Sequence, residues 1–201
     1  MSTQVDDFVY LGGKISDNGS SEPDVRRRIG LACDAAKKLQ MIWKAKGISM
    51  ATKVRVYECL VLSILLYNAE VWTLTADLQR RLRVFEMGCL RRIAGVTRWD
   101  CLRNVDIKAR LGITNDIVQK IQTRRLRYFG HVCRMESSSR LTYVAMHGSV
   151  QGQRGRGRPR KRWLDNVKAD CTEKGLNIVE AERATEDRQK WRTILKLSQR
   201  A

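Results

Sequence analysis

The longest apolar run of the chain is Leu60-Val61-Leu62-Ser63-Ile64-Leu65-Leu66-Tyr67. A helix that crosses a bilayer needs about 20 apolar residues, so this run is far too short to span a membrane. A helix that is apolar on every side is instead a buried one. We therefore expect a helix from about Ser49 to Tyr67 that is buried on all sides within a helical bundle.

Apolar residues recur at helical spacing on both sides of this run. The preceding helix is predicted to begin at Ser21-Glu22-Pro23 and to end at Gly47, with an inward face of Val25, Ile29, Ala32, Ala36, Leu39 and Trp43. The following helix is predicted between Thr75 and Gly95, with an inward face of Leu78, Leu82, Phe85 and Cys89. Together these segments predict a mainly α fold.

The N-terminal stretch has a different period. Residues Phe8 to Ser16 alternate weakly and precede Asp17-Asn18-Gly19, in which Asn-Gly is a turn signal typical of hairpins. A two-stranded hairpin is marginally stable alone. We therefore expect a short β-hairpin, or two strands of a larger sheet, that packs on another part of the chain.

The C-terminal half is also predicted to be helical. Residues 104–135 have the outline of a short helix, a tight turn and a longer helix, which helix-turn-helix proteins share. Another helix opens at Trp163, and a last amphipathic helix runs from about Val179. The expected organisation is a hairpin, a helical bundle, a helical basic segment, an Arg/Gly-rich loop and C-terminal helices, at 1–19, 20–96, 97–150, 151–162 and 163–201.

Charge indicates the class of partner. The 201 residues include 39 Lys and Arg against 21 Asp and Glu, a net charge of +18. Such a field attracts polyanions, above all the phosphates of nucleic acid, with an anionic membrane surface as the competing partner. No small-molecule substrate is expected. The predicted nucleic-acid-binding residues are Arg124, Arg125, Arg127, Arg154, Arg156, Arg158, Arg160, Lys161 and Arg162.

The densest basic run lies at 151–162, where glycines and a proline prevent a regular helix. Its flexible arginines could follow a phosphate chain or enter a narrow minor groove, and Gly157-Arg158-Pro159 matches the core of AT-hook peptides. A solvated loop and a nuclear-import signal remain alternatives. Nearby, Tyr128 and Phe129 could stack on bases, although their spacing favours the buried face of a helix.

Candidate catalytic groups are few. Asp6 and Asp7 lie together without a partner carboxylate, and we expect Asp165 and Asp170 to cap and pair rather than to bind Mg²⁺. The six cysteines are predicted to be free thiols in a reducing, intracellular compartment, nuclear or cytoplasmic, because no signal peptide opens the chain. His131-x-Cys133 lacks the second pair that a zinc site needs. We expect no metal site, no cofactor and no catalysis.

Five blocks resemble, in the correct order, the region downstream of the catalytic core in non-LTR retrotransposon reverse transcriptases. The resemblance covers roughly residues 6 to 195, and its blocks are Phe8–Gly12, Asp24–Ile29, Leu62–Leu74, Arg124–Arg134 and Gly155–Asp165, followed by Asp187-Arg188 and Trp191-Arg192.

The resemblance implies that residues 8–16 form the family's primer-grip hairpin, with Tyr10, Leu11 and Gly12 as its primer-grip-like residues. The helices of 22–95 would be the thumb that holds the template–primer duplex, and the remainder would help to bind the element's RNA and its target DNA. The catalytic aspartates of the palm, which bind Mg²⁺ in the parent polymerase, are not matched, because Asp6-Asp7 directly precede the hairpin and follow no aromatic residue.

The leading interpretation is therefore a non-catalytic fragment of such a reverse transcriptase that binds nucleic acid as part of a retroelement ribonucleoprotein. A sequence-reading DNA-binding regulator, which would use the helices of 104–135 and the Gly-Arg-Pro loop, is the alternative. A translated remnant without a function is a third interpretation.

Overall fold

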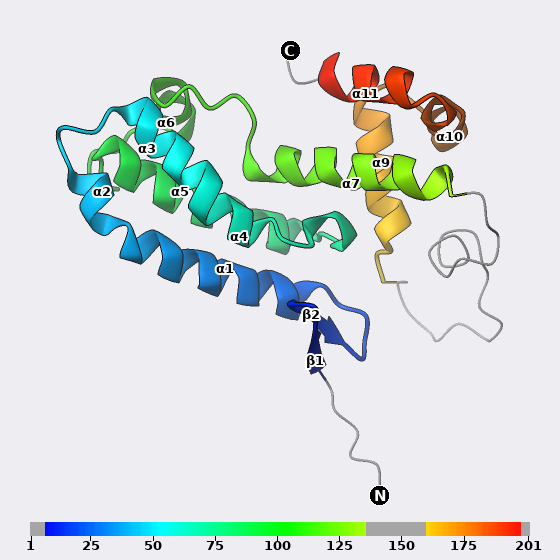
Figure 1. The fold of residues 1–201 in the computed structure, drawn as a ribbon, viewed down its shortest axis with the longest axis horizontal. Coiled ribbons are helices and arrows are strands. Elements are labelled where there is room, and N and C mark those ends of the chain that lie inside the picture. The colour runs from blue at the N-terminus through cyan, green and yellow to red at the C-terminus, as the bar shows by residue number, and fades with distance from the viewer. Residues whose placement is uncertain (1–6, 136–159, 198–201) are drawn as a thin grey trace, which may run out of the picture. The chain divides into compact units, whose positions relative to one another are not determined.

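The computed structural model describes residues 7–135 and 160–197, which form an N-terminal β-hairpin followed by helices and the loops that connect them (Figure 1). The predicted fold class is confirmed. The chain divides into two compact units, Met1–Ile121 and Gln122–Ala201. The segment predicted at 97–150 thus contributes to both units.

The hairpin pairs β1 (Asp7–Tyr10) with β2 (Gly13–Ser16) in antiparallel register, with Tyr10 opposite Gly13. Its turn is Leu11–Gly12, where both φ angles are positive, at 46° and 81°. Positive φ at both central residues is the geometry of a two-residue type I′ turn, which matches the twist of the strands. Asn18-Gly19, the signal in the sequence, instead turns the chain after β2 towards the first helix.

The first helical segment is two helices rather than one, α1 (Glu22–Lys38) and α2 (Gln40–Lys44). They are separated at Leu39, and the Trp43 indole donates a hydrogen bond of 2.8 Å to the Ala36 carbonyl. This bend places Trp43 against the core, as its spacing in the sequence predicted.

The apolar run forms a continuous helical segment of α3 (Met50–Val56), the π-helical turn η1 (Tyr57–Leu62) and α4 (Ser63–Leu65). The prediction that it is buried on all sides is wrong. Val61 and Leu65 are fully buried, whereas half of the Leu60 side chain is exposed. The reason is that α1 and α5 pack on one side of this segment, and the opposite side is open to solvent.

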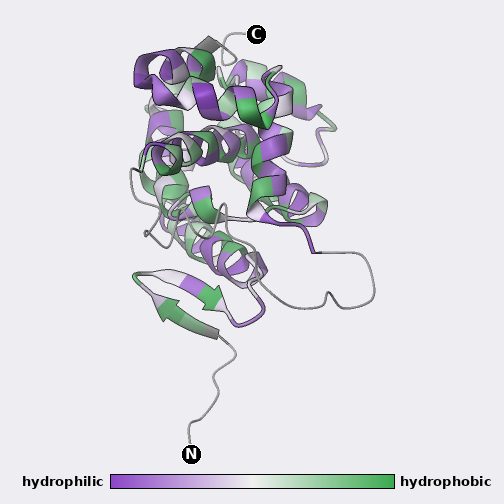
Figure 2. Ribbon diagram, turned by 90° about the vertical axis from the view of Figure 1, so that its right-hand side faces the viewer, coloured by the Kyte–Doolittle hydropathy of each residue, from purple (hydrophilic) through white to green (hydrophobic). Residues whose placement is uncertain are grey.

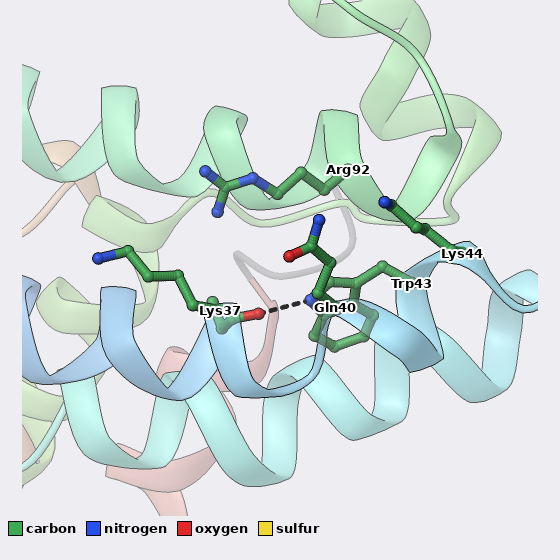
Figure 3. Close-up of a pocket in the computed structure, with 6 residues that line it drawn as sticks. Lys37, Gln40, Trp43, Lys44 and Arg92 are labelled. Carbon is green, nitrogen blue, oxygen red and sulfur yellow. Dashed lines mark hydrogen bonds between the residues drawn. The ribbon is translucent and has the colours of Figure 1, made fainter.

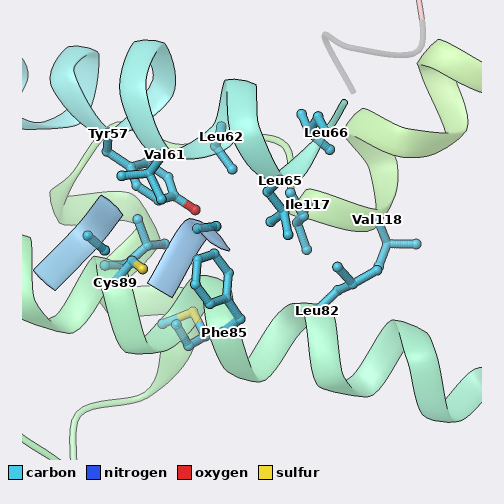
Figure 4. Packing of buried hydrophobic residues seen from close by; sticks show 14 of the residues in the cluster. Tyr57, Val61, Leu62, Leu65, Leu66, Leu82, Phe85, Cys89, Ile117 and Val118 are labelled. Atoms are coloured by element: carbon cyan, nitrogen blue, oxygen red, sulfur yellow. The ribbon is translucent and has the colours of Figure 1, made fainter. Parts of the chain in front are cut away.

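Helix α5 (Ala76–Ala94) confirms the predicted boundaries. The Thr75 hydroxyl accepts a hydrogen bond from the Leu78 amide, and Gly95 ends the helix with a φ of +67°. Its inward face meets the α3–α4 segment and the start of α7 (Ile117–Cys133) in one core (Figure 4). The 3₁₀ turn η2 (Ala69–Val71) leads into α5, and α6 (Asn104–Arg110) packs on α5.

The second unit combines the remainder of α7 with α9 (Trp163–Glu173), α10 (Ile178–Glu186) and α11 (Arg188–Leu197). The predicted single last helix is divided at Asp187, because the Asp187 carboxylate accepts the Gln189 and Lys190 amides and so begins α11. The core of this unit comprises Leu126, Phe129, Val167, Cys171, Ala181, Ala184, Trp191 and Leu195. None of the described helices has both the length and the apolar character that crossing a membrane requires.

Candidate nucleic-acid interface

One face of α7 carries a basic and aromatic strip, which consists of Arg124, Arg127, Tyr128 and His131. Arg127 and Tyr128 each lie three or four residues from Arg124 and from His131, so the four side chains lie on the same side of the helix. Arg124, Arg127 and His131 are exposed, and Tyr128 is partly exposed. We call this set the α7 strip.

The α7 strip lies beside the first residues of α9. The Tyr128 ring meets the Trp163 ring edge-on, with 6.0 Å between the ring centroids. Trp163 directly follows Arg160-Lys161-Arg162, all three of which are exposed. Two basic segments that are far apart in the sequence therefore come together within the second unit, around one aromatic pair.

Arg125 corrects the predicted set. Its side chain is 1% exposed, and its Nε lies 2.7 Å from Asp170 Oδ2 in a buried ion pair between α7 and α9. One residue along a helix is a rotation of roughly 100°, so Arg125 faces the core while its neighbour Arg124 faces solvent. In this arrangement Arg125 joins two helices, and its side chain is not exposed for contact with a ligand.

Of the two aromatic residues expected on the buried face, Phe129 is buried and Tyr128 is only partly buried, and the predicted capping and pairing of Asp165 and Asp170 are confirmed. Phe129 is fully buried and packs against Trp191, with ring centroids 6.2 Å apart. Asp165 accepts the Arg162 amide at 2.8 Å and so caps α9, and Asp170 pairs with Arg125.

The rest of the Arg/Gly-rich run is not placed by the structure. Arg154, Arg156 and Arg158 lie outside the described residues, as do Gly157-Arg158-Pro159 and Asp6. Their predicted roles therefore stay predictions.

The tip of the hairpin is held by side chains of α1 and by Tyr67. The Gly12 carbonyl accepts hydrogen bonds from Arg27 Nη1, at 2.7 Å, and from Arg28 Nη2, and the Leu11 carbonyl accepts the Tyr67 hydroxyl at 2.6 Å. The Arg28 guanidinium also lies over the Tyr67 ring, 4.3 Å from its centroid. The backbone of the tip is therefore fixed, while the Leu11 side chain remains 76% exposed.

The hairpin presents further apolar side chains. Tyr10 is exposed beside Leu11, and Figure 2 shows hydrophobic residues on both strands. Phe8, Val9 and Ile15 are also exposed. The resemblance implied Tyr10, Leu11 and Gly12 as a primer-grip-like group, but the sequence gave no sign that Arg28 would be buried beneath them. Its pairing with Asp24, four residues earlier on α1, is the only signal that could have indicated it.

A small basic pocket lies between α1, α2 and α5 (Figure 3). Its volume is about 280 Å³, and Lys37, Lys44 and Arg92 line it together with Gln40 and the Trp43 ring. All three cations lie in the last turns of their helices, where a positive charge interacts favourably with the negative end of the helix dipole. The interaction with the helix dipoles is sufficient to explain why Lys37, Lys44 and Arg92 gather here, and no bound anion is needed.

Reactive and metal-binding groups are not gathered in the described part of the chain. Within residues 7–135 and 160–197, no three His, Cys, Asp or Glu side chains lie close enough to hold a metal ion together. Burial raises the pKa of the Cys89 and Cys171 thiols to about 12, and that of Cys133 to about 11. These thiols are therefore protonated at neutral pH and are poor nucleophiles.

Comparisons with known proteins give one informative match. The chain is 26% identical to a protein of Caenorhabditis elegans that is described as an uncharacterized transposon-derived protein, over 96% of this chain and 71% of the relative. No family model matches the chain, and no solved structure matches it. The similarity extends through both units and supports a transposon origin for this chain.

Proposed function

We propose that this chain is a non-catalytic nucleic-acid-binding protein derived from the C-terminal part of a retrotransposon reverse transcriptase. It binds RNA, RNA–DNA hybrid or DNA mainly through phosphates and acts within a retroelement ribonucleoprotein. The observation that carries the proposal is the convergence of the α7 strip with Arg160-Lys161-Arg162 around the Tyr128–Trp163 pair. The net charge of +18 and the transposon-derived relative support it.

The chemistry of this surface suits a phosphate chain. Arginine offers several donors in a planar fork that fits phosphate oxygens, and it stays charged at every physiological pH. The partly exposed Tyr128 lies among these cations, so that a sugar or base could contact it while adjacent phosphates meet Arg124 and Arg127.

The start of α7 is less suited to reading base sequence. In helix-turn-helix proteins, residues near the N-terminus of the second helix contact base edges. Here the Gln119 side chain accepts the Asp116 amide at 2.8 Å, and Lys120 pairs with Glu58 at 2.7 Å. Ile117 is buried in the core. These contacts favour phosphate binding over a sequence-reading regulator.

Binding should depend on salt. Fluorescence anisotropy with labelled RNA–DNA hybrid, duplex DNA and single strands would measure the affinity at several salt concentrations. Because each lost phosphate contact on B-DNA removes about 0.9 from the slope of log affinity against log salt, Arg124→Glu/Arg127→Glu should reduce this slope by about 1.8. The matched control is Arg183→Glu/Lys190→Glu, which makes the same change of charge at exposed positions of α10 and α11.

An equal loss of affinity in the two double variants would refute the assignment to the α7 strip. An affinity that does not depend on salt would refute phosphate binding altogether. A primer-extension assay in the presence of Mg²⁺ tests the non-catalytic part of the proposal, and extension of the primer would contradict it. A random-sequence selection that recovers one motif would support the regulator instead.

A further inference from the structure

The first unit carries a second basic groove, which the sequence did not indicate. It has a volume of about 370 Å³ and runs along the outer face of α5 to the loop that precedes α6. Arg80, Arg83, Arg91 and Arg98 line it, and Val84 and Met87 lie between them. No carboxylate is among the described residues that line this groove. We call it the α5 groove.

The arginines of the α5 groove are spaced along one line. Arg80, Arg83 and Arg91 belong to a single helix face, and 1.5 Å of rise per residue separates the first from the last by roughly 16 Å along the axis. An extended backbone that follows this line would meet several positive charges in succession.

These charges are only weakly engaged by the protein. Arg80 pairs with Asp77 at 2.7 Å and Arg83 with Asp116 at 3.0 Å, with the arginine side chains 73% and 50% exposed. Exposed ion pairs contribute little to stability, so a phosphate can compete for these guanidinium groups. Arg91 donates to the neutral Asn104 side chain at 2.7 Å, a partner that brings no negative charge.

An exposed indole stands next to the α5 groove. Trp99 is 93% exposed and directly follows Arg98, which lines the groove. Its loop is ordered, because the Thr97 amide and hydroxyl both donate to the Asp100 carboxylate at 2.6 and 2.9 Å, and the Cys101 amide donates to the Arg98 carbonyl. The loop therefore turns its acidic side chain back onto itself and presents an exposed indole directly after Arg98, which lines the groove.

We propose that the α5 groove binds single-stranded nucleic acid, with phosphates on the arginines and an unpaired base stacked on Trp99. The exposed indole offers a flat apolar face, and every base offers a flat face that can stack on it. In a duplex these faces are stacked on neighbouring bases, so the indole selects for unpaired nucleotides. The proposal goes beyond the phosphate binding assigned to the α7 strip, because it adds a second site with a preference for strand state.

The test uses the full chain and anisotropy titrations with labelled poly(U), poly(dT) and a matched duplex. Trp99→Ala should weaken single-strand binding by about five-fold or more, the lower limit expected for the loss of one stacked base. Trp99→Phe should retain most of the affinity, because a phenyl ring also stacks. Arg98→Ala should reduce the salt slope on single strands by about 0.7. The control is Met41→Ala, which removes an apolar side chain of α2 that is 79% exposed.

Two outcomes would overturn the proposal: an affinity for single strands that Trp99→Ala changes no more than Met41→Ala does, or an equal loss on the duplex. Circular dichroism of each variant establishes that the helices are retained. The failures remain separable, since Arg124→Glu/Arg127→Glu tests the α7 strip, and single-strand binding that is sensitive to that variant but not to Trp99→Ala would reject the α5 groove alone.

Discussion

The ion pair between Arg125 and Asp170 leads to the sharpest test of how α7 divides its arginines between structure and binding. Arg125→Ala would leave the Asp170 carboxylate, which is 3% exposed, without its cation. Removing one partner of a buried pair costs about 3–5 kcal/mol, because the remaining charge is neither hydrated nor compensated. Typical domains are stable by about 5–15 kcal/mol, so this loss is a large fraction of the total.

Hydrogen exchange followed by mass spectrometry is the suitable assay, since peptides that cover α9 report on the second unit alone. A loss of 3 kcal/mol should accelerate exchange of the protected α9 amides by roughly 150-fold. Arg127→Ala is the matched control, because this arginine is exposed two residues away on the same helix, and its effect on stability should stay within about 0.5 kcal/mol.

The double variant Arg125→Met/Asp170→Leu isolates the cause. Replacing both charges with apolar groups of similar size is often neutral or stabilising, so protection in α9 should largely return. The reasoning would be refuted if Arg125→Ala exchanged like Arg127→Ala while it weakened nucleic-acid binding to the same extent, because Arg125 would then act as a surface cation.

Three further perturbations test other parts of the structure. Gly130→Ala should lower the urea midpoint of the second unit by the equivalent of about 1–3 kcal/mol, since a Cβ there would lie 2.5 Å from the Trp191 Nε1. The control Gly30→Ala should not destabilise α1, because its Cβ would meet nothing within 4 Å. Leu11→Asn should increase hydrogen-exchange protection of the hairpin, because asparagine tolerates the φ of +46° better than leucine does; unchanged protection would show that the turn carries little strain. Burial raises the pKa of the Glu86 carboxyl above its ordinary value of 4.5, so the folded protein binds the carboxyl proton more tightly than the unfolded chain does. The stability that this proton contributes is complete below pH 4.5 and is lost as the pH rises through the raised pKa. Urea midpoints measured across this window should therefore fall less steeply with pH in Glu86→Gln than in the unaltered protein, and parallel curves would contradict the assignment.

The architecture could be predicted largely because local signals agreed with burial. Helix α5 illustrates this, since the Thr75 cap, the spacing of its apolar residues and Gly95 all indicate the same boundaries. Where the signals were weaker the prediction failed. Asn18-Gly19 is the more typical hairpin turn, yet the chain turns at Leu11–Gly12, where Arg27, Arg28 and Tyr67 hold the two carbonyls from distant positions.

The candidate binding surface shows the limit of arguments from charge. Arg124, Arg125 and Arg127 are the same residue type in one basic run. Only the orientation of α7 relative to α9 makes Arg125 a core residue. The α5 groove was missed for the opposite reason. Its arginines are spread over 80–98 among apolar residues, so no dense basic run marks them, and the helix brings them onto one line.

The π-helical turn at Tyr57–Leu62 has a consequence for comparing this chain with its relatives. Such a turn closes its hydrogen bonds across five residues instead of four, so it contains one residue more than an α-helical turn. A relative with a regular helix at this place would need a one-residue gap to keep both Lys53 and Leu65 aligned with core positions. An ungapped alignment would rotate everything beyond the turn by roughly 100° about the helix axis and would match buried residues with solvent-facing ones. At 26% identity, correct treatment of that single position decides whether the two halves of this helix are recognised as equivalent.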